Sequence, residues 1–211
     1  MMPVFDDLCL ENGLRGSAAM YSNTPPLLGF SLPPGKGLGP NSPRFNAAVV
    51  KLALERKVRI VVMVAAWSLY ASDEQFGKCL EDTIHQLTAA GIRVVLMRAV
   101  PHHKGDVPRL LVRAKTLGQN IHLVGVPIEA HRFQNLQADQ WLETLAGPLV
   151  SVLDPTPYLS DETGLCRAEF DGVAMYRDSG HLTVEGTRRL KPVFGRLFYD
   201  AGLHGPSASD K

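Results

Sequence analysis

Three nearly uninterrupted apolar stretches, separated by segments with helical periodicity, most constrain the fold of this 211-residue chain. They cover residues 58–66, 92–100 and 149–153. Continuous rather than alternating apolarity predicts strands that are buried on both faces, as in a parallel sheet. Helices are expected at residues 3–13, 44–57, 72–90, 107–117, 129–146 and 183–201. The alternation of strands and helices predicts an α/β chain, built as a three-layer α/β/α sandwich around a mostly parallel sheet.

Local signals refine these elements. Ser72, followed three residues later by Gln75, predicts a capping box, and Asp106 is expected to cap the next helix. Asp171-Gly172 predicts the turn of a small hairpin, and Pro192 is expected to interrupt the last helix. Two further expectations are a short strand at residues 14–21 and an irregular loop rich in proline and glycine at residues 22–43. In the helix at residues 129–146, the side chains expected to point inward are Phe133, Leu136, Trp141, Leu142 and Leu145.

The composition is that of an ordinary globular protein, with 45% hydrophobic and 20% charged residues. We expect one domain at residues 1–204 and a frayed tail at residues 205–211. A formal net charge of +1 argues against a dedicated nucleic-acid binder. The longest uncharged apolar run, residues 60–67, is far shorter than the roughly 20 residues that a membrane span needs. The first residues lack the basic region of a secretory signal.

Asp178-Ser179-Gly180-His181 is the sharpest chemical feature of the sequence. It precedes the last helix, and the aspartate stands three residues before the histidine. A carboxylate so placed can reach Nδ1 of the imidazole, fix its tautomer and stabilise the imidazolium, which leaves Nε2 to act as a general base. The alternative is structural: Asp178 forms a turn, and His181 opens a helix with a satisfied hydrogen bond.

Residues 176–186 resemble the Asp-x-x-His block of SGNH hydrolases, in particular the SGNH domain at the C-terminus of bacterial acyltransferases of type 3, which O-acetylate lipopolysaccharide or peptidoglycan sugars. In that family the block reads Tyr-x-Asp-x-x-His-Leu-Ser-x-x-Gly, and here it reads Tyr-Arg-Asp-Ser-Gly-His-Leu-Thr-Val-Glu-Gly. Weaker similarities lie at residues 25–29, 61–70 and 100–108, so the resemblance covers nearly the whole chain. It implies the SGNH or flavodoxin-like variant of the α/β sandwich.

The family's nucleophile is a serine in a Gly-Asp-Ser-His motif after the first strand, and no such motif occurs in this sequence. The resemblance therefore implies a sheet that lacks its first strand. Three explanations stay open: the start is an internal methionine of a longer reading frame, the chain is a truncated remnant, or the fold closes by other means. The first two are favoured, and the DNA upstream of the first codon distinguishes them. Members of the family often carry two cysteines in the loop before the Asp-x-x-His block, and here only Cys166 is found. Whether Cys166 forms a disulfide is therefore an open question at this point.

Trp67 and Ser68 follow the strand at residues 58–66, at the sheet edge where α/β proteins bind ligands. Members of the SGNH family use an asparagine there in the oxyanion hole. Trp67 is therefore a candidate to line a substrate pocket or to donate its indole N–H to an oxyanion, with Ser68 beside it. The alternative for Trp67 is an aromatic plug in the core. Ser68 becomes a candidate nucleophile only if a base lies about 3 Å away.

Two other sequence patterns give little support for a binding or catalytic site. Residues 34–39 are rich in glycine but lack the first glycine and the hydroxyl residue of a phosphate loop, which disfavours a flavodoxin-like nucleotide binder. His102 and His103 are adjacent and therefore point apart, and no third ligand has a suitable spacing for a metal. The sequence thus predicts neither a metal nor a cofactor.

The resemblance implies an SGNH-type serine esterase or O-acyltransferase domain that acts on acylated cell-envelope sugars, with His181 as base, Asp178 orienting it, and no activity without the missing serine. The alternative is a non-catalytic remnant or carbohydrate-binding relic of that domain. The implied partners are an acylated glycan and a membrane acyltransferase domain in cis, at the periplasmic face of the inner membrane. Hydrolysis of p-nitrophenyl acetate is expected near background. Robust turnover that His181→Ala abolishes would point to a serine within these residues.

Overall fold

The computed structural model describes residues 2–200, and they divide into two compact units that interleave along the sequence. The sheet unit consists of Ala19–Ala99 and Asn135–Asp154. The motif unit consists of the chain up to Ala18, Val100–Gln134 and the chain from Pro155 onward. The predicted tail at residues 205–211 lies outside the described residues, and the single domain at residues 1–204 stays a prediction.

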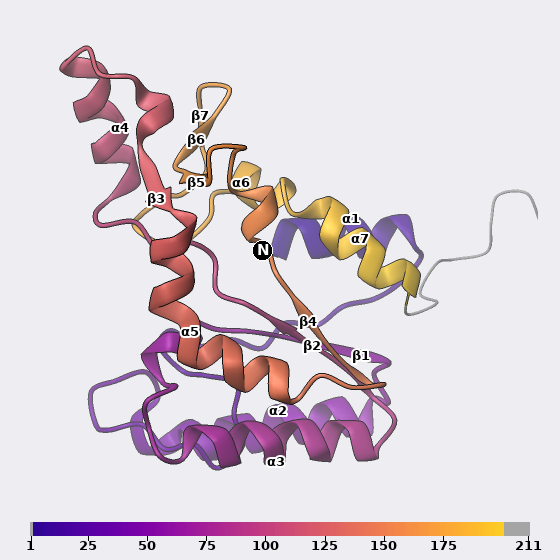
Figure 1. The fold of residues 1–211 in the computed structure, drawn as a ribbon. Coiled ribbons are helices and arrows are strands. Elements are labelled where there is room, and N and C mark those ends of the chain that lie inside the picture. The colour runs from indigo at the N-terminus through magenta and orange to yellow at the C-terminus, as the bar shows by residue number, and fades with distance from the viewer. Residues whose placement is uncertain (1, 201–211) are drawn as a thin grey trace, which may run out of the picture. The chain divides into compact units, whose positions relative to one another are not determined.

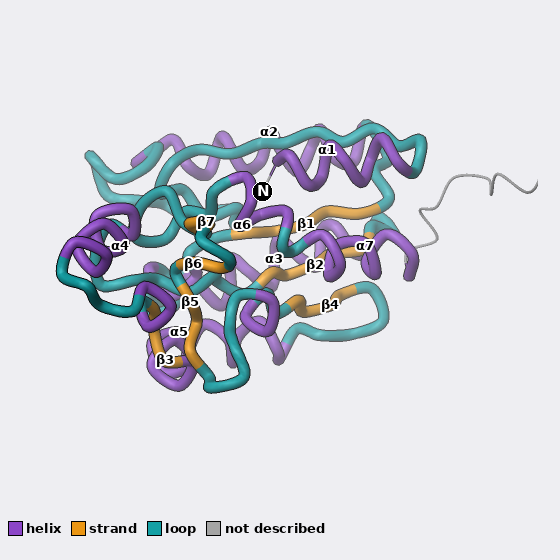
Figure 2. Tube along the Cα trace, turned by 90° about the horizontal axis from the view of Figure 1, so that it is seen from above, coloured by secondary structure: helices purple, strands orange, loops and turns teal. Residues whose placement is uncertain are grey.

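The sheet unit is built on three parallel strands in the order β1-β2-β4, which lie side by side in Figure 2. The strands are β1 (Ile60–Val64), β2 (Arg93–Met97) and β4 (Val150–Leu153). In the register, Val62 pairs with Val95, and Leu96 pairs with Val152. The three strands fall within the three apolar stretches, and the predicted α/β fold with a parallel sheet flanked by helices is confirmed.

Helices α2 (Ser42–Glu55) and α3 (Phe76–Ala89) lie on one side of this sheet (Figure 1). Their apolar faces, together with the second half of α5 (Ile128–Thr144), close one hydrophobic core. Leu80 and Leu87 of α3 and Leu142 of α5 are almost fully buried in it. Burial of each such side chain stabilises the fold by about 1.5–3 kcal/mol.

The strands of this sheet are not equally buried. In β2, four of the five residues are buried, whereas in β1 only Met63 is. Among the described strands, β1 pairs only with β2 and so forms an edge of the sheet. The predicted burial on both faces is therefore correct for β2 but wrong for β1 and for the other edge strand, β4, in which only Val150 and Leu153 are buried. Continuous apolarity does not report how many neighbours a strand has.

The motif unit combines helices with two short antiparallel ladders. Strand β3 (Gly125–Pro127) pairs with β5 (Leu165–Arg167), and β6 (Glu169–Phe170) pairs with β7 (Val173–Ala174). Besides the first half of α5, its helices are α1 (Met2–Glu11), α4 (Val107–Thr116), α6 (Val184–Arg188) and α7 (Lys191–Asp200). Helices α1 and α7 contact each other through the rings of Phe5 and Phe194, whose centroids are 4.6 Å apart. No described helix is both long and apolar enough to cross a lipid bilayer.

Short 3-10 helices connect these elements, at Gly39–Asn41, Trp67–Leu69, Ile121–Leu123 and Thr156–Tyr158. Residues 22–43 otherwise form the expected irregular loop, but residues 14–21 contain no strand, so that prediction is wrong. The predicted hairpin turn is present between β6 and β7, where Asp171 and Gly172 have φ of 53° and 80°. Positive φ at both central residues matches the twist of a tight hairpin.

One of the two predicted helix caps is confirmed and the other is wrong. Asp106 caps α4 as expected, since its carboxylate accepts the N–H of Arg109 at 3.1 Å. Pro192 lies in the first turn of α7, and the break between α6 and α7 precedes it. The capping box at Ser72 is wrong: α3 begins only at Phe76, without a side-chain cap.

Two inward-facing predictions for α5 are also wrong. Phe133 is 81% exposed and Leu136 is 51% exposed. Trp141 and Leu145, by contrast, pack against the core of the sheet unit. Helical spacing identifies residues that share a face, but it does not tell whether the chain covers that face.

Candidate active site

The Asp178–His181 loop is a closed turn between β7 and α6 in the motif unit. Tyr176 and Leu182 form a β-bridge at its base, and the N–H of Arg177 donates to the carbonyl of His181 at 2.9 Å. Directly after the loop, the Thr183 hydroxyl accepts the N–H of Gly186 at 3.0 Å and caps α6. The loop is therefore closed by main-chain hydrogen bonds at its base and followed directly by the side-chain cap of α6.

Asp178 and His181 lie together as the sequence predicts. One carboxylate oxygen of Asp178, Oδ2, is 2.8 Å from Nδ1 of His181. The other, Oδ1, accepts the N–H groups of Gly180 at 2.9 Å and His181 at 2.7 Å. The His181 side chain is 71% exposed. Because Nδ1 faces the carboxylate, Nε2 is the ring nitrogen that remains for a substrate or a nucleophile.

These hydrogen bonds set the protonation of Asp178. Burial alone would raise the pKa of its carboxyl group. The N–H groups of Gly180 and His181 and the His181 imidazole outweigh that effect and hold the pKa at about 2. Asp178 is therefore a carboxylate at neutral pH, able to stabilise a positive charge on His181.

This lowered pKa predicts how stability depends on pH. Because the folded pKa lies below the value of about 3.9 in an unfolded chain, the stabilising contribution of Asp178 is complete above that value and is lost as the pH falls toward 2. The difference in unfolding free energy between the wild type and Asp178→Asn should therefore shrink between pH 5 and pH 2. Urea unfolding at a series of pH values measures it, and a constant difference over that range would contradict this assignment.

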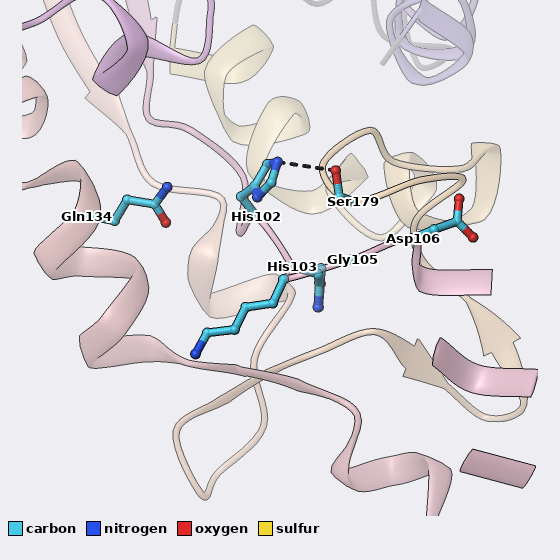
Figure 3. Close-up of a pocket in the computed structure, with 7 residues that line it drawn as sticks. His102, His103, Gly105, Asp106, Gln134 and Ser179 are labelled. Carbon is cyan, nitrogen blue, oxygen red and sulfur yellow. Dashed lines mark hydrogen bonds between the residues drawn. The ribbon is translucent and has the colours of Figure 1, made fainter. Parts of the chain in front are cut away.

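The loop at residues 101–106 packs against the Asp178–His181 loop. The N–H of His103 donates to the carbonyl of Ser179 at 2.7 Å, and the N–H of Val107 points to the carbonyl of Asp178 at 3.4 Å. A cavity of about 380 Å³ lies beside this contact, lined by residues 102–106, Gln134 and Ser179 (Figure 3). The motif unit thus places an open pocket next to the predicted catalytic loop.

The two adjacent histidines of this pocket differ in exposure. His103 is 2% exposed, and its ring packs edge-on against Tyr176 with centroids 4.4 Å apart. Burial, and next the charges of His102 and His131, lower the pKa of His103 to about 4, so its ring is neutral at pH 7. His102 is exposed. Among the described residues, no three side chains of metal-ligating type are grouped to hold an ion.

Trp67 and Ser68 belong to the sheet unit. Trp67 is 1% exposed, lies edge-on to Phe76, and donates its indole N–H to the carbonyl of Met97 at 2.7 Å. This is the core plug that the sequence allows as the alternative, and an oxyanion role would require the bond to Met97 to break. Ser68 is half-buried in the 3-10 helix Trp67–Leu69. The pocket roles of both residues stay predictions.

One contact in the pocket has no counterpart in the predictions from sequence. Ser179 Oγ lies 3.2 Å from Nε2 of His102, and the two side chains point toward one another in Figure 3. The available signal was the position of His102 after the strand at residues 92–100. Nothing in the sequence shows that this loop meets Ser179, which lies 77 residues further on.

The comparisons with known proteins agree on one class of proteins. The model of the SGNH domain fused to AT3 domains matches residues 1–196, and the chain belongs to this family. Among solved structures, the chain is similar to the periplasmic domain of a lipopolysaccharide acetyltransferase from Salmonella ser. Paratyphi A. The TM-score is 0.69 at 15% sequence identity, and the match covers 93% of this chain and 78% of that chain. No curated protein sequence matches.

Proposed function

We propose that this domain handles acyl esters of cell-envelope sugars, as an SGNH-type esterase or O-acyltransferase. The observation that carries the proposal is the 2.8 Å contact between Asp178 Oδ2 and His181 Nδ1. It lies on a hydrogen-bonded loop beside an open pocket. An imidazole oriented by a carboxylate is the general base of hydroxyl-dependent acyl transfer.

Each residue of the pair has a defined task in this chemistry. His181 takes the proton of an attacking hydroxyl, which belongs to a serine, a sugar or water, at Nε2. Asp178 keeps the proton of the neutral ring at Nδ1 and stabilises the imidazolium that forms. The hydroxyl oxygen attacks the acyl carbonyl, and His181 returns the proton to the leaving alcohol. The acyl group ends on a sugar hydroxyl or on water.

The comparisons support the choice of substrate and partner. The similar Salmonella structure is named as a lipopolysaccharide acetyltransferase periplasmic domain, and the family is defined by fusion to AT3 domains. On this basis the acyl acceptor or donor is an envelope glycan at the periplasmic face of the inner membrane. A membrane acyltransferase domain in cis is the partner that delivers the acyl group.

Acetate release and acetyl transfer test the proposal. The 211-residue chain is incubated with p-nitrophenyl acetate or with an O-acetylated oligosaccharide. His181→Asn should lower the rate by roughly 100-fold or more, because general-base catalysis contributes at least that much. His85→Asn, at an exposed histidine of α3, is the matched control and should leave the rate unchanged. A rate that His181→Asn does not affect would contradict the proposal.

A second candidate function is that of a carbohydrate-binding relic of the SGNH domain, for which the open pocket at residues 102–106 offers a binding site. Such a relic binds the glycan, and acetate release stays near background. Calorimetric titration with the O-acetylated oligosaccharide separates the two functions. Saturable binding that is accompanied by background acetate release, and that is the same in His181→Asn, supports the relic.

A further inference from the structure

We propose that α4 and the turn after it form a docking surface for a membrane with anionic lipid headgroups. The proposal goes beyond the proposed function, because it concerns a surface of the domain and not the bond that its site cleaves. The observation behind it is that three cations and three exposed aliphatic side chains share one short segment of the motif unit, residues 107–123. Figures 1 and 2 both show α4 at one end of that unit.

The segment carries positive charge without local compensation. Arg109, Arg113 and Lys115 are all exposed. No acidic residue occurs from position 107 to position 128, although the whole chain has 21 acidic and 22 basic residues. Among residues 2–200, none of the three cations forms an ion pair. A local excess of positive charge attracts an anionic surface.

The helix dipole does not account for the whole cluster. Arg113 and Lys115 lie in the last turn of α4, where the dipole favours cations. Arg109 lies in the first turn, three residues after the cap Asp106, where the dipole disfavours a cation. Because this arginine does not stabilise the helix end on which it lies, an external anion is the better explanation for the three charges together.

Three exposed aliphatic side chains accompany the cations. Val112 is 66% exposed, Leu117 is 58% exposed and Leu123 is 73% exposed. A single exposed leucine is ordinary on a protein surface. Three of them beside three cations match an interfacial segment, whose apolar side chains enter the boundary between headgroups and acyl chains. A purely polar polyanion, such as a nucleic acid, would leave these side chains in water.

Helix α4 presents charged and apolar groups together on the side away from the core. Val107 and Leu111 belong to the hydrophobic core of the motif unit. Arg109, Val112 and Arg113 are spaced three and four residues apart and so share the opposite face of the helix. The aliphatic stems of the arginines can follow the apolar layer while their guanidinium groups reach the headgroups.

The turn after α4 is ordered. Two main-chain hydrogen bonds close a Schellman motif there, from the N–H of Gly118 to the carbonyl of Lys115 at 3.1 Å and from the N–H of Gln119 to the carbonyl of Ala114 at 2.8 Å. Gly118 has a φ of 65°, which glycine adopts without strain. The 3-10 helix Ile121–Leu123 follows and contacts α4. Leu117 and Leu123 are therefore held by a fixed backbone, and their exposure does not come from a loose end.

Vesicle binding tests the docking surface. The 211-residue chain is mixed with vesicles of pure phosphatidylcholine or of an equal mixture of phosphatidylcholine and phosphatidylglycerol, and the bound fraction is measured by co-sedimentation. We expect binding to the mixed vesicles alone, weakened at high salt because salt screens the charges. Arg109→Gln, Arg113→Gln and Lys115→Gln together should lower the affinity by roughly 100-fold, since each cation near an anionic surface contributes about fivefold.

Matched controls change the same kinds of side chain elsewhere. Lys36→Gln, Arg44→Gln and Arg59→Gln together remove three exposed cations of the sheet unit and should leave the binding unchanged. The emission of Leu123→Trp should shift to shorter wavelength on mixed vesicles, because the indole leaves water. Leu69→Trp, at an exposed leucine of the sheet unit, should show no such shift. Circular dichroism shows whether each variant is folded.

Each outcome decides for or against the surface. The proposal is overturned by an absence of binding to mixed vesicles, by equal binding to pure phosphatidylcholine, or by equal losses in the two triple variants. Equal affinity for double-stranded DNA, without an emission shift of Leu123→Trp on vesicles, would also overturn it and indicate a general polyanion surface. Acetate release is measured without vesicles, so it tests the proposed function separately.

Discussion

Replacing Gly186 by alanine should lower the free energy of unfolding by roughly 3 kcal/mol, at the upper end of what overpacking costs. A Cβ atom at this position of α6 would lie 2.2 Å from the carbonyl oxygen of Met175. The obstacle is backbone, so no side-chain rotation relieves it. Met175 is itself fixed, because its carbonyl accepts the N–H of Thr183 at 2.8 Å. The clash must therefore move either α6 or the strand end that leads into the Asp178–His181 loop.

Gly195→Ala is the matched control for this substitution. Gly195 lies in α7, and a Cβ atom there would meet nothing within 4 Å. Alanine should raise the free energy of unfolding by about 0.5–1 kcal/mol, because it restricts the unfolded chain and favours the helix. Urea unfolding of both variants gives the comparison. Equal effects of the two substitutions would show that Gly186 is not packed as described.

Truncating Trp67 should have the other large effect. Trp67→Ala is expected to cost about 3–5 kcal/mol, the range for deleting a fully buried aromatic side chain. Trp67→Phe should cost less, about 1–3 kcal/mol, because it preserves much of the packing but leaves the carbonyl of Met97 without its indole donor. The unfolding free energy in urea is again the measurement.

Leu69→Ala controls for the local helix propensity. Leu69 lies in the same 3-10 helix as Trp67 but is 67% exposed, so its truncation should change stability by at most about 0.5 kcal/mol. If Trp67→Ala were no more destabilising than Leu69→Ala, Trp67 would not be a core residue. Its predicted place in a substrate pocket would then regain support.

The architecture was predictable where it depends on local patterns. Residues 58–66, 92–100 and 149–153 each contain a strand, as their continuous apolarity indicates for a parallel sheet. Burial was less predictable. Val62 and Val95 are equally apolar and are paired in the sheet, yet only Val95 is buried, because β1 has a described neighbour on one side alone.

The candidate site was likewise predictable only in part. Asp178 and His181 could be paired from the sequence, because three residues of a tight turn are enough to bring a carboxylate to an imidazole. Ser179 and His102 could not, since their contact depends on two distant loops that meet in the folded chain. Gly180 gave no signal either: its missing side chain leaves space for the imidazole of His102.

The interleaving of the two units has a practical consequence for dissecting this protein. The sheet unit is made from Ala19–Ala99 and Asn135–Asp154, and the intervening segment belongs to the motif unit. Simple deletion of either terminus therefore cannot yield one unit intact. Isolating the sheet unit calls for a circular permutant or for a short engineered linker that joins position 99 to position 135.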